Sequence, residues 1–260
     1  MYVTEENPVV VGNSGIELPA ASNDGPVIVG DSTESTTPPP NTENQLEIFS
    51  YFPSTVYSIK KPNFLDTVRT VSQEGLAKRR KEQPKLDPIY PLYQTDNLFH
   101  DPRMSEFANY VGSTGWNIIQ SQGYDMTNKN VFFMEMWCQE HHRHSAMDEH
   151  VHGQGAQLVG FYFLDTPKDC QRVVINDPRP GKKQLNLPET NMANVTYASN
   201  AVNFTPEPGM LFFANAWLPH AFSRHAAAKP IRFIHFTLGV GQLPPTQQST
   251  PTAVESPIIV

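Results

Sequence analysis

Nine histidines are present in this chain of 260 residues, and five of them lie between positions 141 and 152. His150 and His152 stand two residues apart beside a predicted strand. Side chains two apart in a strand project from one face, with Cα atoms roughly 6.6 Å from each other, so this pair can offer two imidazoles to one metal ion. A facial site needs a third ligand from elsewhere in the fold, and His220, which follows Pro219 and a predicted strand, is the candidate. The sequence therefore predicts a metal site made of His150, His152 and His220.

The identity of the third ligand has an alternative. Asp148 would share a strand face with His150 if the strand extends that far back. Asp148 and His152 cannot easily both join His150, because residues four apart in a strand lie about 13 Å from each other. The spacing favours His152. A polar loop is expected to hold three more histidines at the surface: His141, His142 and His144.

Arg232 lies in an alternating strand predicted over residues 231–238 and shares a face with Ile234, Phe236 and Leu238. A charged side chain on the apolar side of a strand is costly unless it meets an anion. Two interpretations follow, namely a structural salt bridge to a core acid or the binding of an anionic ligand.

The elements that must position these residues come in two groups. Helical spacing of apolar residues predicts helices over 63–82, where Pro62 and Asn63 are start signals, and over 105–122. A strand pair broken at Pro53 is predicted to open the core. Runs rich in β-branched and aromatic residues predict further strands over 131–138, 157–164, 172–176, 201–205, 210–214 and 231–238. So many short strands favour a closed barrel or a two-sheet jelly roll over an alternating α/β fold.

The two ends of the chain differ from its core. Residues 1–45 contain seven acids, no lysine or arginine, and a run rich in proline, serine and threonine. Residues 243–260 also lack lysine and arginine and are rich in proline, serine and threonine. Such segments bury too little apolar surface to offset the entropy of ordering, so we expect flexible tails. The predicted organisation is a tail over 1–45, a mainly β jelly-roll domain over 46–242 with two N-terminal helices packed on it, and a tail over 243–260.

The net charge of −7 belongs to these tails, because the core carries 18 acids and 19 bases. A near-neutral core does not indicate a nucleic-acid binder. No apolar run approaches the roughly 18 to 20 residues that span a bilayer, so no membrane association is expected. The start of the chain shows no signal-peptide pattern, and only Cys138 and Cys170 are present, so we expect reduced thiols in a cytoplasmic protein.

Several motifs in order along the chain carry a resemblance. They are Glu135-Met-Trp137, His150-Val-His152, the aromatic strand 160–164, Asp177-Pro-Arg179, Pro208-Gly209, His220 and Arg232. Together they resemble the iron(II)- and 2-oxoglutarate-dependent oxygenase superfamily, in particular an uncharacterised bacterial and phage subfamily with a His-x-His motif. The resemblance covers roughly residues 47–240 and implies a double-stranded β-helix of the cupin-like jelly-roll type.

The resemblance also implies a reaction. Fe(II) held by the catalytic residues His150, His152 and His220 would bind 2-oxoglutarate and O2, and the remote carboxylate of 2-oxoglutarate would pair with Arg232. Oxidative decarboxylation to succinate and CO2 would accompany oxidation of a substrate C–H bond, most simply a hydroxylation. Tyr162 could contact 2-oxoglutarate through its hydroxyl, although a core aromatic is an equally good interpretation. The expected substrate is a small molecule or a protein.

The chain departs from the superfamily, which mostly has His-x-Asp where this chain has His150-Val-His152, and which often has a small hydroxyl residue where Ile234 stands. Two alternatives to a dioxygenase therefore stay open. One is a cupin-like metal-binding protein without 2-oxoglutarate, which has no need of an inward Arg232. The other is a non-catalytic protein that keeps the fold and whose tails bind a protein partner or a virion assembly, which would make it virion-associated if phage-encoded.

Overall fold

The computed structural model describes residues 9–11, 50–185 and 187–243. The strands are β1 (Val9–Val11), β2 (Val56–Lys60), β3 (Leu92–Gln94), β4 (Lys129–His141), β5 (Met147–His150), β6 (Ala156–Asp165), β7 (Val173–Asn176), β8 (Ala201–Phe204), β9 (Met210–Asn215), β10 (His220–Phe222) and β11 (Ile231–Gln242). The α-helices are α1 (Leu65–Glu82) and α2 (Ser105–Ser121), and the 3-10 turns are η1 (Pro62–Phe64), η2 (Pro102–Met104) and η3 (Lys182–Gln184). The fold is mainly β, as predicted.

The strands form two antiparallel sheets of a jelly roll. The large sheet has the order β1-β2-β9-β6-β11-β4-β3 and the small sheet the order β5-β10-β7-β8. In the middle of the large sheet the neighbouring strands are far apart in sequence, as where β11 lies between β4 and β6. Over the described residues the two sheets do not close into a barrel, so of the two predicted architectures the two-sheet jelly roll is confirmed.

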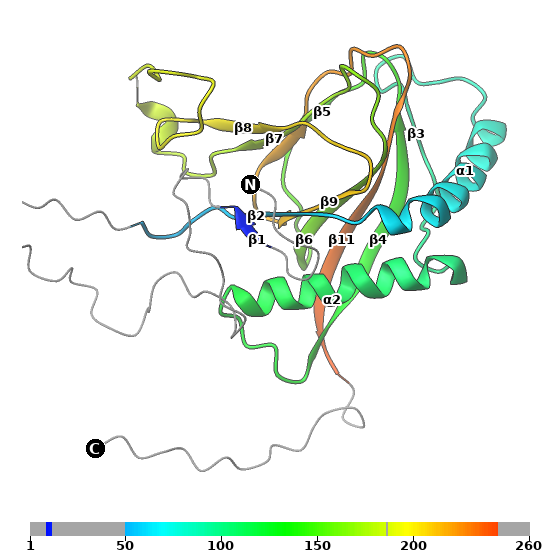
Figure 1. Cartoon of the computed structure of the whole chain (residues 1–260), viewed down its shortest axis with the longest axis horizontal. Helices are drawn as coiled ribbons and strands as arrows, with labels where there is room; N and C mark the ends of the chain where they lie inside the picture. The colour runs from blue at the N-terminus through cyan, green and yellow to red at the C-terminus, as the bar shows by residue number, and fades with distance from the viewer. Residues whose placement is uncertain (1–8, 12–49, 186, 244–260) are drawn as a thin grey trace, which may run out of the picture.

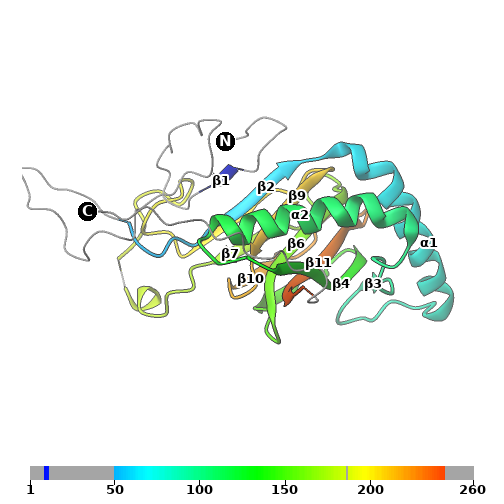
Figure 2. The same ribbon diagram turned by 90° about the horizontal axis from the view of Figure 1, so that it is seen from below.

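Both faces of the large sheet are covered. Its outer face packs against α1 and α2, where Val68, Leu76 and Phe107 join sheet residues such as Tyr162 and Phe236 in one buried cluster. Its inner face packs against the small sheet in a second cluster, rich in phenylalanine. Figure 1 shows α2 running beneath the large sheet, and Figure 2 shows it lying across the strands. Alternate residues of each central strand therefore enter two different apolar layers.

The helices begin where the sequence predicts. The turn η1 starts at Pro62, whose fixed φ suits a first helical position, and leads into α1. Ahead of α2, the side chain of Asp101 accepts a hydrogen bond from the backbone N–H of Arg103 and caps η2. Both helices turn their buried apolar residues toward the outer face of the large sheet.

Some predicted elements differ from those observed. Of the strand pair predicted to open the core, only β2 is a strand among the described residues, since 50–52 are not. The segment predicted as a flexible N-terminal tail contains β1, which pairs antiparallel with β2 at the edge of the large sheet. The rest of that segment, like residues 244–260, lies outside the described residues. No helix among the residues described is long and apolar enough to cross a membrane.

Gly160 in β6 provides a test of the outer layer. A Cβ at this position would collide with the ring of Phe236 and lie 2.6 Å from the carbonyl oxygen of Phe212. We therefore expect Gly160→Ala to lower the free energy of unfolding by about 2 kcal/mol or more through overpacking. The control is Gly112→Ala in α2, where a Cβ meets nothing within 4 Å and alanine should stabilise the helix slightly. Chemical denaturation measures the free energy of unfolding of both variants. Equal values for the two would contradict the close packing of Phe236 against Gly160.

Candidate metal centre

Two of the three predicted histidines are cross-strand partners. His150, the last residue of β5, lies opposite His220, the first residue of β10, in the small sheet. Directly opposed residues of an antiparallel pair bring their Cβ atoms to about 5 Å. The two imidazole centroids accordingly lie 4.5 Å apart.

His152 completes the group from just beyond the end of β5, so the structure corrects the expectation that both histidines lie along one strand. Its backbone N–H donates to the carbonyl oxygen of Ala216 at 2.9 Å. This bond holds the His152 ring 5.2 Å from the rings of both His150 and His220. One ligand atom from each of the three histidines lies within 4.8 Å of the other two.

Backbone carbonyls orient two of these rings. Nδ1 of His150 lies 2.8 Å from the carbonyl oxygen of Asp148, and Nδ1 of His220 lies 2.9 Å from that of Leu218. Because a carbonyl only accepts, each Nδ1 must carry the proton, and each Nε2 keeps its lone pair. A metal-bound histidine is usually held by such a second bond.

The inward nitrogens have the character of metal ligands. Nε2 of His152 and Nε2 of His220 are buried and find no hydrogen-bond partner among the described residues. A buried polar atom without a partner is costly, and a divalent ion would satisfy both atoms. Burial also lowers the pKa of each of these two imidazoles to about 4, so both are neutral at neutral pH and no proton competes with a metal.

The other predicted ligand, Asp148, has a different place. It is exposed on β5, and its carboxylate joins neither of the groups of clustered ligand atoms found in the described residues. Its backbone carbonyl, rather than its side chain, contacts His150. The geometry thus supports His152 as the third ligand.

Two further donors, Glu135 on β4 and His235 on β11, lie beside the three histidines. The His235 ring is 5.3 Å from that of His152 and stacks on Trp137 at the same 5.3 Å. Sequence reasoning missed both residues as donors. Strand alternation in 231–238 does place His235 on the face opposite Arg232, which is the signal that could have found it.

Phenylalanine rings close the inner side of the site. Phe161 lies 5.9 Å from His220, and it packs edge-on to Phe222 at 5.0 Å and to Phe233 at 5.9 Å. All three phenylalanines belong to the cluster between the sheets. His150 and His152 are only half-buried, so a ligand approaches from their side.

Arg232 does not lie where the sequence prediction places it. It shares the outer face of the large sheet with Ile234 and Phe236, while Phe233 and His235 point toward the histidines. Its Nε donates to Glu140 at 2.5 Å and its Nη1 to Asp165 at 3.0 Å, and these acids are its register partners on β4 and β6. Glu140 and Asp165 are therefore the acidic partners that the salt-bridge interpretation requires. The role of Arg232 in binding 2-oxoglutarate stays a prediction that this geometry does not favour.

Tyr162 is on the same outer face. Its hydroxyl donates to the carbonyl oxygen of Lys61 at 2.7 Å, and its ring lies 4.9 Å from that of Phe107 on α2. Burial raises the pKa of this phenol well above its ordinary value. Tyr162 thus has the contacts of a core aromatic, the second of the two interpretations that the sequence left open.

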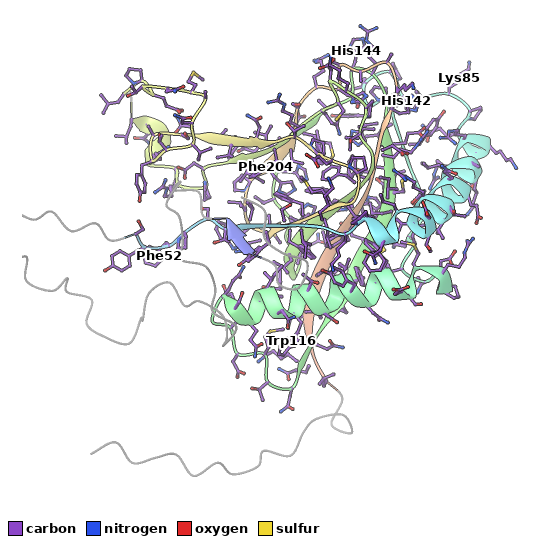
Figure 3. The ribbon with its side chains drawn as sticks, viewed as in Figure 1. Phe52, Lys85, Trp116, His142, His144 and Phe204 are labelled. Atoms are coloured by element: carbon purple, nitrogen blue, oxygen red, sulfur yellow. The ribbon has the colours of Figure 1, made fainter. Side chains whose placement is uncertain are left out.

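The polar loop also differs from expectation at one residue. His142 is half-buried and His144 exposed, and both lie at the top of Figure 3, in the loop after β4. His141, by contrast, is fully buried at the end of β4. Its ring nitrogens lie 3.2 Å from Gln171 and 3.3 Å from Gln139. The prediction that His141 is a surface residue is wrong, because β4 extends further than the apolar run indicates.

His141 makes the stability of the metal-free protein depend on pH. Burial lowers its pKa to about 4 in the folded chain. The unfolded chain binds a proton there near pH 6.5 and the folded chain does not, so stability is present above pH 6.5 and falls as the pH drops toward 4. We expect His141 alone to remove about 3 kcal/mol over this interval. Urea denaturation in EDTA should show a shallower pH dependence for His141→Gln, and identical profiles would contradict the burial.

Part of the chain is similar to a known protein family, and its fold is similar to that of solved structures. Residues 135–234 match the family described as "Putative 2OG-Fe(II) oxygenase", and no curated protein sequence matches the chain. Among solved structures, AviO1 from Streptomyces viridochromogenes Tue57 superposes with a TM-score of 0.51 at 13% identity, over 74% of this chain and 92% of that one. The predicted family is confirmed. Residues 135–234 are thus similar to the 2OG-Fe(II) oxygenase family, and the fold agrees with that of AviO1.

Two other solved structures are similar at lower TM-scores. A prolyl-4-hydroxylase from Pseudomonas putida has a TM-score of 0.45 at 12% identity, over 70% of this chain and 91% of that one. HygX from Streptomyces hygroscopicus, solved with nickel and 2-oxoglutarate, has a TM-score of 0.45 at 13% identity, over 72% and 83%. The segment that matches the family model contains all three clustered histidines and Glu135, and it ends just before His235.

Proposed function

We propose that this chain is an Fe(II)- and 2-oxoglutarate-dependent dioxygenase that hydroxylates a small-molecule or protein substrate, with His150, His152 and His220 as the iron ligands. The observation that carries the proposal is the cluster of three imidazoles in a segment of the 2OG-Fe(II) oxygenase family, with two inward Nε2 atoms buried and unpaired among the described residues. Neutral imidazoles are common ligands of iron.

The residues present fit such an ion. Three ligands on one side leave open positions for 2-oxoglutarate and O2, and bound iron would couple decarboxylation of 2-oxoglutarate to oxidation of a substrate C–H bond. The carbonyls of Asp148 and Leu218 hold two ligand rings in place. The wall of Phe161, Phe222 and Phe233 keeps water from the inner side of the site.

A second function is favoured by one observation. Arg232 and Tyr162, the two residues predicted to bind 2-oxoglutarate, lie on the helix-covered face of the large sheet and already have partners. A cupin-like metal protein that does not use 2-oxoglutarate needs neither residue near its metal. The same three histidines would then serve a different reaction or simple metal binding.

Succinate formation separates the two functions. We expect the protein, loaded with Fe(II) under air, to convert 2-oxoglutarate to succinate slowly even without its substrate, and His150→Ala to lose this activity. Titration of the anaerobic Fe(II) protein with 2-oxoglutarate should also produce the visible charge-transfer band of the chelate. Metal binding with neither succinate nor a band would overturn the dioxygenase and leave the metal protein.

A further inference from the structure

Glu135 and His235 form, with His152, a second cluster of ligand atoms. One such atom from each of the three residues lies within 4.8 Å of the other two. Glu135 comes from β4, and His235 from the neighbouring strand β11. In the register of these strands Glu135 lies opposite Thr237 and His235 opposite Trp137, so the two donors are diagonal neighbours on the inner face.

Nδ1 of His235 is a buried polar atom that no described residue satisfies. The residue is 3% exposed, and its Nδ1 is buried without a hydrogen-bond partner among the described residues. Its ring is held by stacking on Trp137, at an interplanar angle of 17°. An apolar ring would make the same stack, so an unpaired Nδ1 at this depth indicates a ligand.

One ion cannot use all five donors. Two ligands of a common ion lie at most about 4.2 Å apart, twice a metal–nitrogen distance of about 2.1 Å. The ligand atoms of Glu135 and His235 cluster with His152 but not with His150 and His220. The five side chains therefore describe two ion positions that share His152.

We propose that Glu135, His152 and His235 form a second position for a divalent transition-metal ion, which the ion occupies in exchange with the three-histidine position. The two sets differ in charge and donor type. The first has three neutral nitrogens, whereas the second has two nitrogens and a carboxylate, a combination that suits Fe(II), Co(II) and Mn(II). This inference does not depend on a dioxygenase reaction.

The second position binds more weakly than the first. Two rings of the three-histidine position are oriented by Nδ1 bonds to backbone carbonyls. No equivalent bond among the described residues orients His235, and Glu135 is only half-buried. The sharing of His152 keeps the stoichiometry at one ion per chain.

The test is cobalt binding in a His150→Ala background, followed by equilibrium dialysis and by the visible spectrum of Co(II). His150 is half-buried, so the alanine variant should fold, which circular dichroism checks. We expect His150→Ala to bind one Co(II) about 100-fold more weakly than the unaltered chain, and Glu135→Gln or His235→Phe to weaken it at least about 10-fold further. The phenylalanine keeps the stack on Trp137.

The matched control is Asp148→Asn in the same background, which removes a nearby exposed carboxylate and should change the affinity less than about threefold. If Glu135→Gln and His235→Phe also change it less than threefold, or if folded His150→Ala binds no Co(II) at 1 mM, the second position does not exist. Those outcomes leave the dioxygenase standing. Conversely, failure of the unaltered Fe(II) protein to form succinate would remove the dioxygenase and leave the second position untouched.

Discussion

His220→Ala is expected to lose its iron during gel filtration, with an affinity for Fe(II) at least about 100-fold below that of the unaltered chain. His220 is the one ligand of the three-histidine position that is fully buried, and its Nδ1 bond to Leu218 aims Nε2 at the other two imidazoles. Removing it leaves His150 and His152 as an incomplete pair, so that only the weaker position of Glu135, His152 and His235 remains whole, and desalting should strip an ion from it. Elemental analysis of the desalted protein gives the result.

The control for this variant is His144→Ala. His144 belongs to the same stretch of histidines but is exposed in the loop after β4 and joins neither ligand cluster. Its removal should leave the iron content unchanged. A folded His220→Ala protein that retains one equivalent of iron through desalting would show that the three-histidine assignment is wrong.

Arg232→Ala is expected to lower the free energy of unfolding by about 3 kcal/mol while metal content and 2-oxoglutarate affinity stay unchanged. Glu140 is 1% exposed, and Arg232 is one of the two arginines that neutralise it, the other being Arg80. The substitution also removes a partner of Asp165. Because Arg232 lies on the outer face of the large sheet, the loss should not reach the histidines on the inner face.

Arg103→Ala provides the comparison for stability. Arg103 also pairs with two acids, Glu74 and Asp101, but at the surface, where solvent screens the charges and Arg103→Ala should change the stability far less than Arg232→Ala does. Denaturation and anaerobic 2-oxoglutarate titration should be done on both variants. A loss of 2-oxoglutarate affinity of about 100-fold in folded Arg232→Ala would restore the anchoring role predicted from the sequence.

Elements with strong local signals were predictable from the sequence. Pro62 and the helical spacing after it predict α1, and the apolar runs predict β6 and β9 to within one residue at each end. The same runs predict where β4 and β11 lie, but both strands continue several residues past the predicted ends. The short strands β3 and β10 were not predicted, and β5 was anticipated only through the strand spacing assumed for His150 and His152. Each has only three or four residues, and such a strand exists because of its hydrogen-bonded neighbours rather than its own propensity.

The candidate metal site was likewise predictable in part. The spacing of His150 and His152 and the position of His220 after a strand were enough to predict that three histidines could converge. Their actual geometry comes from pairing, since β5 and β10 set His150 opposite His220 and the backbone bond to Ala216 holds His152. His235 and Glu135 join them only because β11 and β4 are neighbours in the large sheet.

For Arg232, the sequence predicts which residues share its face of the strand but not which layer that face contacts. The alternation of β11 correctly predicts that Arg232 shares a face with Ile234 and Phe236. It does not say which layer that face meets, because a strand of a sheet covered on both sides carries apolar residues on both faces. Only the packing of α1 and α2 on one side, and of the small sheet on the other, decides that Arg232 faces the helices and His235 faces the clustered histidines.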